Sequence, residues 1–398
     1  MGIIAYGRQA PGALKCWWQN GLTCVQPGAY DGLFDLAFYG GGVGLMFTRR
    51  RTIVHSLAMA LACSALVVAQ KNEKKQDDAQ KKEIQNVVKL VDEVAAGQPA
   101  PNDLSLAWSR EDFLKAQGNK EYVPFTVTID PSKVTGGTVA FYWRVVAQNA
   151  SAAPAAPATP AGKNDKKDDK GKKADYAYED IAFVPVTPTQ NPTRISRSFT
   201  VPAGTYDVFV VVKEPTQEKA PKGAPPPKAS ILKQSLTVPD FWNGELATSS
   251  VIIAQRIDPL PAPLTPQQQA DRPYALGTME IVPAPDTKFT KKSELSTFML
   301  IYNPKVDAAN KPDVTVEYNF YTKAGGTEKF FNHTSPQNLN AQTLPPQFDL
   351  TAGHQLQSGQ AVPLASFPEG EYRLEIKVTD KIANKSLTKD VEFTVSAS

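Results

Sequence analysis

The stretch Pro202–Lys213, PAGTYDVFVVVK, decides the fold, because a second copy lies near the C-terminus as Pro368–Thr379, PEGEYRLEIKVT. Both copies read Pro-x-Gly-x-Tyr and then alternate with a period of two, which is typical of a β-strand with one buried face. Each copy is followed by one further strand-like run, at Ile231–Val238 and at Leu387–Val395. The repeat predicts a mainly β protein with two tandem Ig-like antiparallel β-sandwiches.

Length, charge and cysteine content limit the classes of function. The 398 residues are enough for two or three domains with their own cores. A formal net charge of +3, with no stripe of basic and aromatic residues, does not indicate a nucleic-acid partner. Cys16, Cys24 and Cys63 all precede the predicted mature chain, so we expect neither a disulfide framework nor a cysteine metal site.

Residues 46–69 have the pattern of a secretory signal peptide. Three arginines, Arg49–Arg51, precede the apolar run Ile53–Val68, and small side chains precede an expected cleavage before Gln70. The protein is therefore expected to be exported to the periplasm, the cell envelope or the outside of the cell. An uncleaved anchor is the alternative, so contact with a membrane is expected only through this segment. Residues 1–45 show no sustained periodicity, and we interpret them as an over-extended or disordered N-terminus.

A charged amphipathic helix and a linker are predicted over residues 70–118, after the signal peptide. Within Glu73–Ala96, apolar residues recur at spacings of three and four, and Gly97 ends the pattern. We expect this apolar stripe to dock on its own domain, with pairing to another helix as the alternative. A second, short helix is predicted at Ser109–Ala116.

The sandwiches are predicted at residues 119–257 and 274–398. Thr138–Ala147 is apolar on both faces, which indicates a central strand. An Ala/Pro-rich and charged segment, 150–174, is predicted to be a disordered insertion in the first sandwich. The segment 258–273 contains five prolines, which predicts an extended connector between the two domains.

Several runs resemble the Ig-like modules of secreted bacterial proteins, in particular the C-terminal regions of GWxTD-domain and VWFA-related proteins. These runs are Leu236–Phe241 (LTVPDF), Leu246–Ala254 (LATSSVIIA), Phe289–Tyr302 (FTKKSELSTFMLIY) and Gly370–Leu374. The resemblance covers roughly residues 195–398 and implies a sandwich fold and export. The chain has neither a Gly-Trp-x-Thr-Asp sequence nor the Asp-x-Ser-x-Ser start of a VWFA domain, so no activity of those domains is implied.

Residues that could carry chemistry do not form a recognisable constellation. His333 and His354 lie near expected turns without a histidine partner at metal-ligand spacing, so no zinc site or catalytic triad is predicted. We interpret carboxylate pairs such as Glu369 with Glu371 as solvent-exposed charges. Asp380 and Asp390 flank a turn, and weak calcium binding there would need an oxygen-rich loop that is missing. We expect no catalytic residues, no metal and no cofactor, and we expect that the protein is not an enzyme.

Exposed aromatic side chains give the remaining indication of a ligand. Trp242 and Phe241 lie in the turn Asp240–Gly244, outside the predicted strands, and are candidates for stacking against a sugar ring. The sequence favours an exported, non-catalytic interaction or scaffold protein of the bacterial cell envelope that binds a protein partner through its sandwich surfaces. The alternative is a carbohydrate-binding module that uses these aromatics on an envelope polysaccharide.

Overall fold

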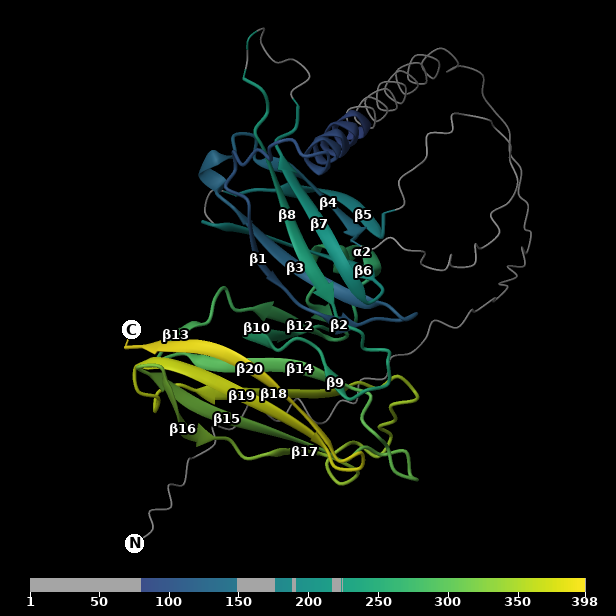
Figure 1. Cartoon of the computed structure of the whole chain (residues 1–398), viewed down its shortest axis with the longest axis vertical. Coiled ribbons are helices and arrows are strands. Elements are labelled where there is room, and N and C mark those ends of the chain that lie inside the picture. Colours follow the sequence, from purple (N-terminus) through teal and green to yellow (C-terminus); the bar gives the residue numbers. More distant parts are fainter. Residues whose placement is uncertain (1–79, 149–175, 188–190, 217–222, 224, 398) are drawn as a thin grey trace, which may run out of the picture.

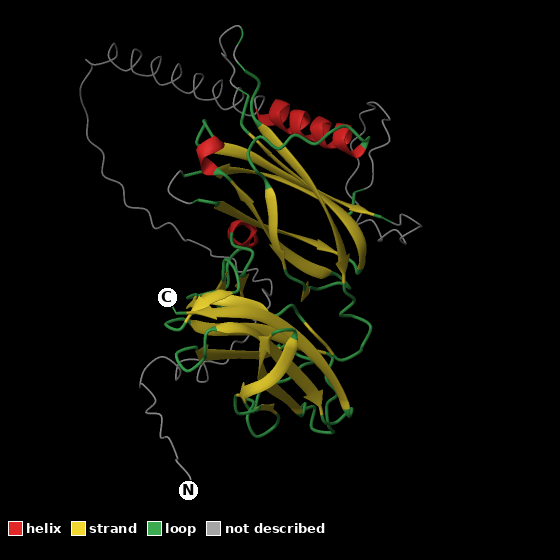
Figure 2. Cartoon of the chain, turned by 60° about the vertical axis from the view of Figure 1, so that its left-hand side comes forward, coloured by secondary structure: helices red, strands yellow, loops and turns green. Residues whose placement is uncertain are grey.

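The computed structural model describes residues 80–148, 176–187, 191–216, 223 and 225–397. These residues form two β-sandwiches, one above the other in Figure 1, with a helix over the outer face of the first (Figure 2). The ladders are antiparallel, except that β13 runs parallel to β20. The expected mainly β, double-sandwich fold is confirmed. The predicted signal peptide and the insertion 150–174 lie outside the described residues.

The first sandwich has two four-stranded sheets that enclose one apolar core. One sheet has the order β5-β4-β7-β8; in the other, β3 lies between β6 on one side and β1 with β2 on the other. The bounds are β1 Ala107–Glu111, β2 Leu114–Lys115, β3 Glu121–Ile129, η1 (a 3-10 helix) Pro131–Lys133, β4 Thr138–Ala147, β5 Tyr178–Pro185, β6 Thr193–Val201, β7 Gly204–Lys213 and β8 Ala229–Val238.

The short helix expected at Ser109–Ala116 is wrong, because this stretch forms β1 and β2 instead. The backbone of β1 pairs with β3 from Ala107 opposite Thr128 to Glu111 opposite Phe125. Trp108 stacks on the Phe125 ring with centroids 4.9 Å apart. Tertiary pairing with the free edge of β3 therefore outweighs a weak local helical preference.

The repeated Pro-x-Gly-x-Tyr motif has the same geometry in both sandwiches. The Tyr206 hydroxyl donates to the Pro202 carbonyl at 2.9 Å, and the Tyr372 hydroxyl donates to the Pro368 carbonyl at 2.6 Å. The glycine between them has a φ of 155° in the first copy and 149° in the second, a region that other residues rarely adopt. The motif is thus a tyrosine corner that fixes the start of β7 and of β19.

The N-terminal helix, described over residues 80–95, packs on the outer face of the β5-β4-β7-β8 sheet. Val87 and Val91 are fully buried there against side chains of β4, β7 and β8. Buried Lys213 donates to buried Glu83 of the helix, and buried Arg144 donates to Asp92 at 2.6 Å. Docking of the helix on its own domain is confirmed, and it explains why both faces of β4 are apolar.

The second sandwich has two six-stranded sheets around a second core. One has the order β11-β12-β10-β14-β18 with β9 on β14, and the other has β13-β20-β19-β15-β16 with β17 on β15. The bounds are β9 Ala247–Thr248, β10 Ile252–Pro259, α2 Pro266–Asp271, β11 Ala275–Leu276, β12 Met279–Pro283, β13 Lys288–Thr290, β14 Glu294–Tyr302, β15 Val314–Ala324, β16 Thr327–His333, β17 Gln337–Leu339, β18 Leu356–Pro363, β19 Gly370–Asp380 and β20 Lys385–Ser396.

Strand β18 was not predicted, because its sequence contains Gly359 and ends in proline. A Cβ at Gly359 would lie 2.6 Å from the carbonyl oxygen of Thr297 on the neighbouring strand β14. The glycine is therefore a requirement of close backbone approach rather than a sign of a loop.

The predicted boundary between the domains is wrong. Strand β10 pairs with β12 and β14, so it belongs to the second sandwich and not to a first domain ending at residue 257. The expected connector 258–273 lies inside the second sandwich and includes α2, which Thr265 caps. The actual link between the sandwiches is the segment 239–246, between β8 and β9.

An apolar cluster joins the two sandwiches directly. Leu114 of β2 packs with residues of the second sandwich: Ile252, Ala254, Tyr274, Ile281, Phe298, Leu300 and Tyr302, and with Phe241 of the link. Polar contacts surround it: Tyr122 donates to the Pro273 carbonyl at 2.8 Å, and Arg197 pairs with Asp271 of α2 at 3.0 Å. A shared apolar interface of this kind holds the two domains in a fixed relation.

Candidate functional site between the two sandwiches

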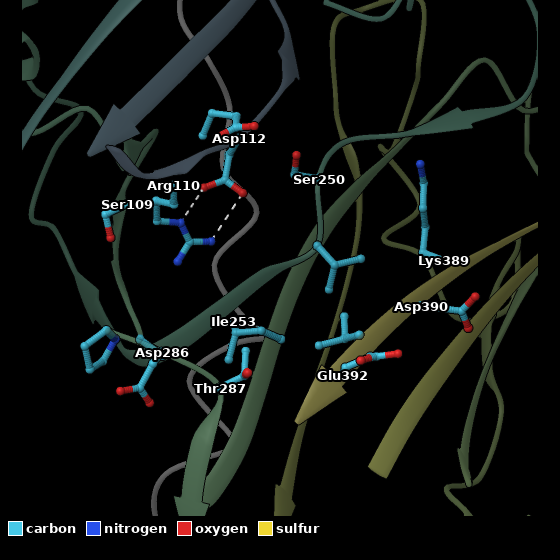
Figure 3. A pocket seen from close by; sticks show the side chains of 15 residues that line it. Ser109, Arg110, Asp112, Ser250, Ile253, Asp286, Thr287, Lys389, Asp390 and Glu392 are labelled. Carbon is cyan, nitrogen blue, oxygen red and sulfur yellow. Dashed lines mark hydrogen bonds and ion pairs between the residues drawn. The ribbon is translucent and has the colours of Figure 1, made fainter. Parts of the chain in front are cut away.

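A polar cleft of about 460 Å³ lies where the sandwiches meet. One wall is Ser109–Asp112 at the end of β1, and a second is the segment Ala284–Thr287, which crosses from one sheet of the second sandwich to the other. The remaining walls are Ser250, Val251 and Ile253 beside β14, and Lys389–Glu392 of β20. Figure 3 shows these side chains, which come from both sandwiches. The sequence did not predict this cleft.

A buried carboxylate, Asp112, lies at one wall of the cleft. Arg110 donates from Nε to Oδ2 at 3.0 Å and from Nη2 to Oδ1 at 3.3 Å (dashed lines in Figure 3), and the Tyr274 hydroxyl donates to Oδ2 at 2.8 Å. Burial raises the pKa of Asp112 above its ordinary value, and the charge of Arg110 opposes this shift. Burial also raises the pKa of Tyr274 well above its ordinary value, so the phenol remains protonated and can donate. Because both carboxylate oxygens have donors, the cluster joins the sandwiches and does not present a free acid.

The lining of the cleft is acidic although the chain as a whole is basic. Five carboxylate side chains and two basic side chains line it, a formal charge of −3, while the full chain has +3. The acidic residues are Glu111, Asp112, Asp286, Asp390 and Glu392, and the basic residues are Arg110 and Lys389. A cleft with one predominant sign of charge attracts ligands of the opposite sign.

Strand β20 presents an unpaired edge to this cleft. Its other edge pairs with β19 along Lys385–Val395 without a register shift, whereas β13 pairs only with Thr394–Ser396. The Thr394 N–H donates to the Thr287 carbonyl at 3.0 Å, so it points to the β13 side. Backbone groups alternate sides along a strand. Four residues therefore direct their N–H and C=O groups to the open side, where no partner lies among the described residues: Ser386, Thr388, Asp390 and Glu392.

The two aromatic residues proposed for stacking lie in the link between the sandwiches, outside the cleft lining. Phe241 is 4% exposed, and its ring packs 4.9 Å from the Tyr302 ring, so its expected role on an accessible surface is wrong. Trp242 is 41% exposed. Its indole N–H donates to the Lys120 carbonyl at 3.1 Å, and the Lys115 ammonium lies 4.1 Å from its ring centroid. Sugar stacking on Trp242 stays a prediction.

The histidines and the turn carboxylates take part in local structure. His354 accepts the Asp349 N–H at 3.0 Å, and His333 is exposed on β16. Asp380 accepts the N–H groups of Ile382 and Ala383 at 3.0 Å, so it closes the β19–β20 turn. Within the described part of the chain, no group of three or more His, Cys, Asp or Glu side chains could hold a metal ion.

No family model and no curated protein matches the chain. Solved structures that resemble it include Escherichia coli alpha-2-macroglobulin activated by porcine elastase, at 11% identity and a TM-score of 0.20 over 72% of this chain and 23% of that chain. Salmonella alpha-2-macroglobulin reacted with methylamine is similar at 14% identity and a TM-score of 0.20, over 75% of this chain and 17% of that chain.

Likenesses at this TM-score carry no argument about the function of this chain, which covers less than a quarter of the length of either protein. The resemblance to GWxTD-domain and VWFA-related proteins therefore extends, beyond the sequence motifs, only to the general β-sandwich fold. In the described residues, no helix is both long enough and apolar enough to span a membrane.

Proposed function

We propose that this protein is an exported, non-catalytic scaffold of the bacterial cell envelope that binds a protein partner by adding one strand of the partner to β20. The observation that carries this proposal is the open edge of β20 beside the cleft. In strand addition, main-chain hydrogen bonds provide affinity and side-chain pockets provide specificity. The open stretch from Ser386 to Glu392 is about 20 Å long at ~3.3 Å per residue, which suits a strand of ordinary length.

The opposite edge of the same sheet supports the choice of β20. At that edge, β16 has a register shift in its pairing with β15, where Phe320 faces Asn332 and Tyr321 faces Phe330. Lys329 is exposed there as well. Bulges and exposed lysines are features by which proteins protect an edge from additional strands. The unbroken register of β20 with β19 lacks the first of these features.

The apolar cluster around Leu114, which forms the seam between the two sandwiches, also supports a binding role. Leu114 and the apolar residues around it hold the β1 wall of the cleft against the second sandwich, and the Asp112 cluster reinforces this contact. A pre-formed cleft reduces the entropy lost when a partner binds. Each main-chain hydrogen bond contributes only about 1 kcal/mol net, so side-chain contacts in the cleft must supply part of the affinity.

Export and the envelope location rest on the signal-peptide pattern of residues 46–69. Sandwich modules with an exposed edge are common in binding roles, but that association comes from the fold and not from a site. The test of the proposal therefore addresses the edge itself.

The test compares Thr388→Pro with Thr388→Val. Proline removes the N–H that points to the open side, and it leaves the β19 pairing intact because the Thr388 groups do not face β19. Valine keeps the N–H and the β-branched shape. Random linear peptides displayed on phage are selected on the wild-type chain, and binding of the recovered peptides is then measured on both variants.

We expect recovered peptides to bind Thr388→Pro at least about tenfold more weakly than wild type, and to bind Thr388→Val normally. The thermal unfolding midpoint of each variant shows that the fold is retained. Peptides that bind Thr388→Pro as tightly as wild type, or a selection that yields no peptide sensitive to this change, would refute strand addition at β20.

A further inference from the structure

We infer that the strand received by β20 is basic, with a lysine or arginine that points into the cleft toward Glu111 and Asp286. This inference rests on the proposed function, because it assumes that an extended segment of the partner lies along the β20 edge. The open edge sets the backbone position of that segment, and the charges in the cleft set its side chains.

Ion pairs already compensate three of the five carboxylates that line the cleft. Asp112 pairs with Arg110 at 3.0 Å. On the outer face of the second sandwich, Asp390 pairs with Arg373 at 2.6 Å and Glu392 pairs with Lys323 at 2.5 Å. These three carboxylates therefore have little remaining attraction for a ligand.

Glu111 and Asp286 form no ion pair within 4 Å among the described residues, although the charge of the neighbouring Arg110 attracts Glu111. Glu111 accepts the indole N–H of Trp108 at 2.6 Å, and Asp286 accepts the Lys288 N–H at 2.9 Å. Neither bond neutralises a carboxylate charge. Both residues line the walls across the cleft from β20, and Figure 3 shows Asp286 and Lys389 on opposite sides. A long cationic side chain from a strand on β20 would extend toward this acidic wall.

Lys389 determines where along β20 that cationic residue lies. Its side chain is on the cleft side of the strand and has no ion-pair partner among the described residues. Like charges directly opposite one another on paired strands are destabilising. The basic residue of the partner therefore lies beside Val391, nearer Asp286, and not opposite Lys389. An inward-pointing lysine also disfavours purely apolar strands, which protects the edge from unspecific pairing.

The test uses two labelled peptides of alternating threonine and valine that differ only in one central residue, lysine or glutamate. Their binding to the purified chain is measured by fluorescence polarisation. We expect the lysine peptide to bind about tenfold more tightly at low salt, and we expect this preference to shrink as salt screens the charges.

The double variant Glu111→Gln and Asp286→Asn should remove the preference, because each amide keeps one acceptor oxygen and a similar shape but loses the negative charge. Glu317→Gln with Glu371→Gln is the matched control, since both residues lie on β15 and β19 and do not line the cleft. The control should keep the preference.

The outcomes separate this inference from the proposed function. If both peptides bind equally and both are lost in Thr388→Pro, the edge binds strands but the charge inference is wrong. A lysine preference that persists in the double variant also overturns the inference. If neither peptide binds, or if binding of both is insensitive to Thr388→Pro, strand addition at β20 and the inference that depends on it both fail.

Discussion

Replacing Leu114 with alanine should uncouple the two sandwiches. Leu114 is 3% exposed and is the fully buried aliphatic contribution of β2 to the cluster at the seam. The change removes about three methylene equivalents at ~0.8 kcal/mol each. The cavity left behind adds to this, so the free energy of unfolding should fall by about 3–5 kcal/mol. The lost contacts are those between domains, so the loss should reduce the coupling as well as the stability.

Urea unfolding with two probes measures both effects. The described tryptophans, Trp108, Trp143 and Trp242, lie in the first sandwich or in the link, so tryptophan fluorescence reports on that half of the molecule. Far-ultraviolet circular dichroism reports on the strands of both sandwiches. In the wild type the two transitions should coincide, as in cooperative unfolding. In Leu114→Ala they should separate.

Leu295→Ala is the matched control. Leu295 is 1% exposed and lies in the core of the second sandwich, away from the cluster at the seam. The same chemical change there should lower stability by a similar amount but should not separate the two transitions by loss of an interdomain contact. Two separate transitions in the wild type, or a loss below about 1 kcal/mol in Leu114→Ala, would show that the seam does not couple the sandwiches.

Three further expectations follow from other contacts. Glu83→Gln leaves Lys213 charged and buried without its ion-pair partner, so it should lower the free energy of unfolding in urea by about 3–5 kcal/mol. Glu93→Gln, which breaks the exposed ion pair with Lys89, should lower it by less than ~0.5 kcal/mol. Burial raises the pKa of Glu121 above its ordinary value of about 4.5. The contribution of Glu121 to the free energy of unfolding is therefore greatest below pH ~4.5 and falls as the pH rises through the raised pKa. Glu121→Gln should remove this dependence of the unfolding free energy on pH. Intact mass of the protein recovered from bacterial cells should show an N-terminus at Gln70, and retention of residues before it would contradict cleavage there.

The strands that were predicted correctly are those in which the side chains of each face already indicate what that face packs against. Along β4, Phe141 and Trp143 face the main core, while Ala140 and Tyr142 face the helix, and each set is apolar for that reason. The Pro-x-Gly-x-Tyr repeat was equally visible in the sequence. The structure explains it, because backbone conformation requires Gly204 and Gly370, and each tyrosine hydroxyl donates to a proline carbonyl. Local requirements of this kind restrict the residue types at particular positions, so they can be recognised in the sequence.

The domain boundary could not be predicted in the same way. A run of prolines usually indicates an extended connector, yet here the segment that contains α2 contacts β6 of the other sandwich through the pair Asp271–Arg197. Strand β10 has the same local pattern whichever sandwich it joins, and only its pairing with β12 and β14 assigns it. The exposure predicted for Phe241 is wrong for the same reason. Its burial depends on the surface of the second sandwich that packs against it, and the sequence of its own turn does not show that surface.

The candidate site combines features that are separate in the sequence and meaningful only together. Glu111, Asp286 and Lys389 lie in three distant segments, and each one alone reads as an ordinary charged surface residue. The open edge of β20 is an absence of pairing, caused by the early end of β13, and no residue type encodes it. The proposal rests on this combination of a strand edge with two carboxylates, Glu111 and Asp286, that form no ion pair among the described residues. The proposed recognition at this site therefore depends on the fixed relation of the two sandwiches that the Leu114 cluster maintains.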